Sequence, residues 1–192
     1  MYVDQRQAQL ILDLANRKLT AEEFIKQFPL EGLDPRVAGQ AILTQASVSH
    51  DANAVEYGLI LGYYFGFNER YIEVLRLLAQ EDWHYKHEDI ASAMAVLKST
   101  DCIDALFRLT LKNFPYLDYD ESFSLARKCI WALGKIGTVE SVEKICLLAG
   151  SGNDTIKKYA RRQLQHIVNE DLPEVVKKVA LDALSALQNT NG

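Results

Sequence analysis

The chain has 192 residues, of which 48% are hydrophobic and 24% are charged, and its formal net charge is -5. This composition is typical of a folded globular protein and argues against a disordered chain. No run of about 18 apolar residues is present that would span a membrane, and the negative net charge disfavours nucleic acid as a partner and favours a basic one.

Apolar residues recur at intervals of three and four residues along almost the whole chain, which predicts amphipathic helices. No stretch alternates apolar and polar residues, so we expect no sheet, and short links between helices predict antiparallel neighbours. In chain order, we expect helices over residues 3–16, 20–28, 35–49, 51–66, 69–80, 87–98, 101–113, 121–136, 139–149, 154–168 and 173–188.

Several predicted helices begin at side chains that typically cap helices. Thr20 and Glu23 have the spacing of a capping box. Asp34 with Pro35 predicts the start of the next helix, and Asp51 predicts the start of the one after it.

The apolar spacing of one helix is repeated in later helices. Stacked helical pairs of this kind cannot bury their apolar faces alone, so each pair must pack against the next. The repeated positions are Leu125, Cys129, Leu133 and Ile136, then Ile156, Ala160, Leu164 and Ile167, then Val176, Ala180, Leu184 and Leu187.

The segment ARKCIWALGKIGTVESVEKICLLA resembles a HEAT repeat of the bacterial type first described in phycobilin lyases. Ala132, Leu133, Gly134, Ile136 and Gly137 fill its motif, and a glycine at the last position is expected to be left-handed. The resemblance is good over about 121–188, weaker over about 87–113, and weakest over 51–80.

The resemblance implies an all-α fold, a short right-handed α-solenoid of antiparallel helical hairpins with about 10–11 helices. Residues 51–192 would form the repeat array. Residues 1–50 do not match the repeat and are expected to cap its exposed end, in a single compact unit with the array.

No arrangement typical of an enzyme is present. Cys102, Cys129 and Cys146 lie on apolar helical stripes, as expected for reduced core thiols of a cytoplasmic protein. His84 and His87 are three residues apart, but no third metal ligand accompanies them. We therefore expect no catalytic residues, no cofactor and no metal.

Two segments combine aromatic and acidic residues, FPYLDYDES at 114–122 and EDWHYKHED at 81–89. Exposed aromatics beside carboxylates would bind a basic partner. The candidate partner-binding residues are Trp83, Tyr85, Glu88, Asp89, Tyr116, Asp118, Tyr119, Asp120 and Glu121. In the structural alternative, Phe114 and Leu117 fill a gap between repeats while Asp120 or Ser122 caps the following helix.

These features favour a protein that binds another protein, with no role at a membrane. Many small acidic HEAT-like proteins of bacteria are immunity proteins, and LTAEEFIKQFP resembles the N-terminal hairpin of some of them. This resemblance implies that the protein neutralises a toxin by covering it, the partner being a basic toxin domain.

A cluster of basic residues suggests an alternative function, the binding of nucleic acid. Lys157, Lys158, Arg161 and Arg162 form two pairs four residues apart and share one helix face. With an aromatic such as Trp131 nearby, they would bind phosphates, as the basic groove of HEAT-like DNA glycosylases does. The same charges would otherwise form a solvated surface.

Overall fold

The computed structural model describes residues 1–30, 32–118, 120 and 122–189, and the structural statements below concern those residues. Within them, all regular structure is helical, with eleven α-helices, two short 3₁₀ helices and no strand. The predicted all-α class is therefore confirmed. None of these helices is both long enough and apolar enough to cross a membrane.

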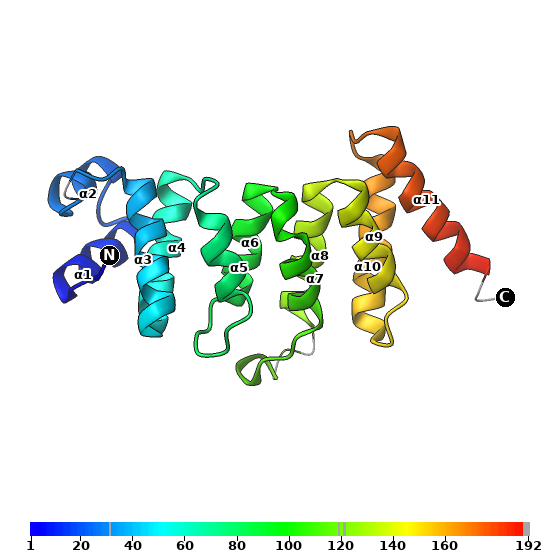
Figure 1. Ribbon diagram of the computed structural model, residues 1–192, viewed down its shortest axis with the longest axis horizontal. Coiled ribbons are helices and arrows are strands. Elements are labelled where there is room, and N and C mark those ends of the chain that lie inside the picture. The colour runs from blue at the N-terminus through cyan, green and yellow to red at the C-terminus, as the bar shows by residue number, and fades with distance from the viewer. Residues whose placement is uncertain (31, 119, 121, 190–192) are drawn as a thin grey trace. The chain divides into compact units, whose positions relative to one another are not determined.

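The chain forms two compact units, residues 1–97 and 98–192. The first unit is coloured blue to green in Figure 1. Its helices are α1 (Gln5–Ala15), α2 (Ala21–Gln27), α3 (Pro35–Ser49), α4 (Ala52–Phe65), α5 (Tyr71–Leu78) and α6 (His87–Leu97). The boundary predicted between residues 50 and 51 falls inside this unit, between α3 and α4, which pack against each other.

The second unit begins with the short 3₁₀ helix η1 and carries the remaining five α-helices (Figure 1). Helix α10 packs against α8, α9 and α11, and α7 packs against α8. The elements are η1 (Thr100–Cys102), α7 (Ile103–Leu111), η2 (Pro115–Leu117), α8 (Ser124–Ile136), α9 (Val139–Ala149), α10 (Asp154–Asn169) and α11 (Glu174–Asn189).

The helix ends follow the signals in the sequence. Thr20 and Glu23 form the expected capping box, with the Thr20 N–H donating to the Glu23 carboxylate at 2.8 Å. Asp34 and Asp51 accept hydrogen bonds from the first backbone N–H groups of α3 and α4. Gly137 ends α8 with φ +67°, the left-handed conformation predicted for the motif glycine.

Most of the repeated apolar positions lie in the core of the second unit. On α8 and α10 they are buried except for Ile136, which is half-buried, and on α11 Val176 and Ala180 are buried while Leu184 and Leu187 are half-buried. Cys102 and Cys129 are buried as expected, but Cys146 is only half-buried, and burial raises the pKa of its thiol. The internal similarity therefore identified positions that are mostly buried.

Helices α3 and α4 approach each other closely because both carry a glycine at their crossing. A Cβ atom on Gly58 would lie 2.6 Å from Cγ of Leu43 and 2.8 Å from the carbonyl oxygen of Gly39. Neither separation is possible for a real side chain, so any residue with a Cβ would force the two helices apart.

We therefore expect Gly58→Ala to lower the free energy of unfolding by about 1–3 kcal/mol, the cost of overpacking a tight interface. Gly152→Ala is the matched control, because nothing lies within 4 Å of its added Cβ. Urea denaturation followed by circular dichroism measures both variants. Equal unfolding midpoints would show that the helices separate without cost.

Candidate functional site

The connection between α7 and α8 contains the first aromatic–acidic segment. Phe114 is buried, and Nζ of Lys112 lies 4.8 Å from the centre of its ring. Tyr116 and Leu117 are half-buried, with the Tyr116 ring tilted 43° to that of Phe114 at 6.0 Å. The first part of the segment thus packs onto the fold, as its structural interpretation expected.

The carboxylate of Asp120 organises the second part of the segment. Oδ2 accepts a hydrogen bond from the N–H of Ser124, the first residue of α8, at 2.7 Å. Oδ1 accepts from the N–H of Ser122 at 3.0 Å and also from the Ser122 hydroxyl. Asp120 thus accepts a hydrogen bond from the start of α8 as predicted, but from outside the N-cap position, which is occupied by Phe123. These hydrogen bonds, the Ser122 hydroxyl first, lower the pKa of Asp120 below its usual value.

The capped turn holds Phe123 in the left-handed region, at φ +51°. A non-glycine residue adopts this conformation only where the surroundings enforce it. Here the ring of Phe123 remains 39% exposed immediately before the helix begins. The turn thus presents an aromatic side chain to solvent.

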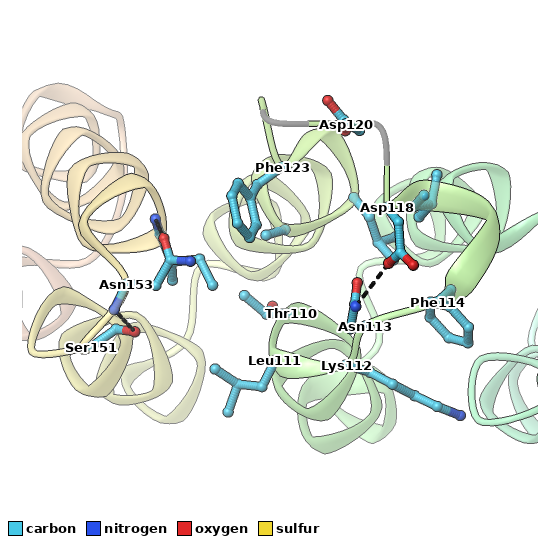
Figure 2. Close-up of a pocket in the computed structure, with 14 residues that line it drawn as sticks. Thr110, Leu111, Lys112, Asn113, Phe114, Asp118, Asp120, Phe123, Ser151 and Asn153 are labelled. Carbon is cyan, nitrogen blue, oxygen red and sulfur yellow. Dashed lines mark hydrogen bonds between the residues drawn. The ribbon is translucent and has the colours of Figure 1, made fainter.

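A groove of about 520 Å³ lies beside this turn. It is bordered by the end of α7, the connection to α8, the start of α8 and the link between α9 and α10 (Figure 2). Its lining residues are Thr110, Leu111, Lys112, Asn113, Phe114, Leu117, Asp118, Asp120, Phe123, Leu125, Ala126, Ser151, Asn153 and Ile156.

The groove combines exposed apolar surface with carboxylates. Leu111 is 54% exposed, and its side chain and the Phe123 ring both line the groove. Asp118 is exposed and accepts a hydrogen bond from Nδ2 of Asn113 at 2.9 Å (Figure 2). An apolar depression with acidic groups on its wall can hold a side chain that is apolar along its length and cationic at its end.

Some predicted residues of this segment do not line the groove or cannot be placed. Tyr116 is not among the lining residues. Tyr119 and Glu121 lie outside the described residues. Of the predicted set, Asp118 and Asp120 therefore form the described acidic wall.

The second aromatic–acidic segment lies in the first unit, between α5 and α6. Trp83 is half-buried, its ring stacks on that of His50 at 5.0 Å, and its Nε1 donates to the Glu81 carboxylate at 3.0 Å. Tyr85, by contrast, is 65% exposed. Trp83 is thus held by the fold, whereas Tyr85 offers its ring to solvent.

Two buried histidines fix the backbone of this segment. His84 Nδ1 accepts from the Lys86 N–H at 3.2 Å, so its Nε2 carries the hydrogen donated to the Leu78 carbonyl at 2.8 Å. Nε2 of His87 likewise meets the Glu81 carbonyl at 2.8 Å. The two rings stack with their centres 4.3 Å apart. These imidazoles act as structural groups within the core.

Glu88 and Asp89 occupy the first turn of α6, where a negative charge stabilises the helix. Both are half-buried. The Tyr63 hydroxyl donates to the backbone carbonyl of Asp89 at 2.7 Å. Burial of the hydroxyl, with the nearby Asp89 charge, raises the pKa of Tyr63 to about 12. Glu88 and Asp89 therefore act mainly by stabilising the start of α6.

The basic cluster lies on α10, and its four members line one shallow depression together with Asp154 and Gln165. Lys157 forms an ion pair with Asp154 at 3.0 Å. Lys158 and Arg162 also line a second groove, of about 610 Å³, between α8 and α10. That groove contains Trp131, the aromatic residue named in the alternative prediction.

Comparison with known proteins adds no assignment, because no protein-family model, curated protein or solved structure matches the chain. Within the described residues, no group of three or more histidine, cysteine or acidic side chains is placed to hold a metal ion. The candidate site is therefore defined by its geometry alone.

Leu111 and Phe123 are not among the residues predicted from the sequence. The helical periodicity could have identified Leu111. Leu106 and Leu109 lie on the buried face of α7, whereas the position of Leu111 places it outside that face. Phe123 gave no comparable signal, because its exposure depends on the left-handed turn that Asp120 stabilises.

We expect Asp120→Ala to lower the free energy of unfolding by about 1 kcal/mol at pH 7, as removal of a side chain that accepts hydrogen bonds at the start of a helix does. The pKa of Asp120 is lowered in the folded state. Its contribution is therefore fully present above the unfolded pKa of about 4 and is lost as the pH falls through the lower folded value. Urea titrations at pH 7 and pH 3 should show that the difference in free energy of unfolding between variant and wild type is smaller at pH 3. Asp118→Ala is the control. It removes a carboxylate of the same connection that accepts one exposed hydrogen bond, from Asn113, and it should cost less than Asp120→Ala.

We expect His84→Phe to lower the free energy of unfolding by about 1–3 kcal/mol, because the Leu78 carbonyl and the Lys86 N–H would both lose a buried partner. His166→Phe is the control. His166 is exposed and pairs with Glu170, so its loss should cost less than about 1 kcal/mol. Thermal unfolding curves of equal midpoint would contradict the structural role of His84.

Proposed function

We propose that the protein is a non-catalytic, HEAT-like helical protein of the cytoplasm that binds a basic protein partner. Its helices would stack as antiparallel hairpins in a short right-handed solenoid. The most specific form of this proposal is an immunity protein, which neutralises a bacterial toxin by binding the toxin and covering its active site.

One observation carries the proposal: the groove beside the α8 turn places the exposed side chains of Leu111 and Phe123 next to the Asp118 and Asp120 carboxylates. Apolar side chains supply binding free energy when a partner covers them. Carboxylates at the edge attract a basic partner and accelerate its association. A protein surface bearing lysine or arginine beside apolar residues would match both features.

The segment at 81–89 would provide a second contact surface. Tyr85 is the exposed aromatic there, and tyrosine offers a large contact area with few torsions to restrict. Trp83, Glu88 and Asp89 would contribute from partly buried positions.

The test is capture of a partner on immobilised wild-type protein, identification by mass spectrometry, and calorimetric titration of the purified partner. The double variant Leu111→Ser, Phe123→Asn removes the two exposed apolar side chains of the groove. Asparagine is chosen at position 123 because it tolerates a left-handed backbone. We expect its affinity to fall at least about tenfold. The control Leu147→Ser, Val175→Ser alters two exposed apolar residues outside the groove and should bind like wild type.

The immunity form of the proposal requires a further result. An equimolar amount of the wild-type protein should abolish the partner's toxic activity, and the groove variant should need a larger excess. Capture of an acidic partner, or equal affinity of the groove and control variants, would refute the proposed site.

A further inference from the structure

Positive charge is concentrated on two neighbouring helices, although the chain as a whole is acidic. Helix α8 carries three basic residues and no acidic residue, and α10 carries four basic residues with a single acid, Asp154. The two helices pack against each other. Their adjoining surfaces thus form a basic face on a protein whose net charge is -5.

The groove between these helices is lined by cations and aromatic rings. Its lining residues are Arg127, Ile130, Trp131, Lys158, Tyr159, Arg162, Gln163 and His166. Arg127, Lys158 and Arg162 are exposed, and none of the three forms an ion pair with another described residue. Their charges are therefore available to a ligand.

The aromatic group of this groove is accessible as well. Trp131 is 45% exposed, although it lies on a helix whose other large apolar residues are buried or half-buried. Nζ of Lys135 lies 5.5 Å from the centre of its ring. In proteins that bind single strands, nucleobases stack on exposed aromatic rings while the phosphates pair with nearby basic side chains. Trp131 and the cations around it have this arrangement.

The charges follow the helix axis at regular intervals. Lys158 and Arg162 are four residues apart on α10, which corresponds to about 6 Å along the axis. Arg127 and Trp131 have the same separation on α8. A row of cations beside a ring suits a ligand with repeated phosphates and bases, whereas an acidic peptide would leave the indole without a stacking partner.

We propose that the α8–α10 groove binds a short stretch of single-stranded nucleic acid. One base would stack on Trp131, and successive phosphates would contact Lys158, Arg162 and Arg127. This site is separate from the groove at Leu111 and Phe123, so either proposal can fail without the other. The narrow extent of the basic face favours a single strand, because a duplex requires a broader positive surface.

The test is fluorescence anisotropy of a labelled ten-residue oligothymidine titrated with the full chain over a range of salt concentrations. We expect Lys158→Ala, Arg162→Ala to weaken binding at least about tenfold and to reduce the slope of log K against log salt by about 1.4, since each phosphate contact contributes about 0.7. The control Lys177→Ala, Lys178→Ala removes the same charge from α11 and should leave affinity within about twofold.

A third variant separates stacking from charge. Trp131→Leu should weaken binding about tenfold while leaving the salt slope unchanged, because stacking contributes without releasing counterions. Circular dichroism confirms that each variant is folded. Thymidine monophosphate should bind far more weakly than the oligonucleotide, because it contacts one cation instead of three.

Several results would overturn the inference. These are the absence of oligonucleotide binding at low salt, equal losses in the groove and α11 variants, and thymidine monophosphate binding as tightly as the strand. A ten-residue polyglutamate peptide that binds as well as the oligonucleotide, and equally well to Trp131→Leu, would assign the groove to acidic peptides instead.

Discussion

The hydrogen bonds of the Asp120 carboxylate are the interaction on which the groove at Leu111 and Phe123 depends. They join the connection after α7 to the first turn of α8 and hold Phe123 in a left-handed conformation. The carbonyl of Ser122, in the same turn, accepts a hydrogen bond from the Tyr159 hydroxyl at 2.9 Å. The turn thus holds Phe123 at one groove and is hydrogen-bonded to Tyr159, which lines the other.

The surface chemistry of the second unit differs between its two grooves. One places carboxylates beside apolar side chains, and the other places arginine and lysine beside an indole. The net charge of -5 conceals this division, because it sums over the whole chain. Electrostatic attraction acts over about 8–10 Å at ordinary ionic strength, so a ligand close to either groove responds mainly to the charges there.

The helices could be predicted from sequence because apolar periodicity and capping residues act locally, as Thr20, Asp51 and Gly137 illustrate. Exposure of Trp131 could not be predicted, since it depends on neighbours distant in sequence, and burial of Phe114 was one of two alternatives that the sequence left open. Trp83 shows the same limit: acidic neighbours suggested a binding residue, but its ring is stacked on His50. That Leu111 and Phe123 line one groove likewise depends on the packing of segments that a linear pattern does not relate.

The bond between Tyr159 and the Ser122 carbonyl has a thermodynamic consequence. Tyr159 lines the basic groove, while its acceptor belongs to the turn that shapes the apolar one. A ligand that rotates the phenol away would remove a tether from that turn and alter the free energy of occupying the neighbouring groove. Linkage makes such an effect reciprocal, so the two occupants would act as heterotropic effectors of each other through one tyrosine.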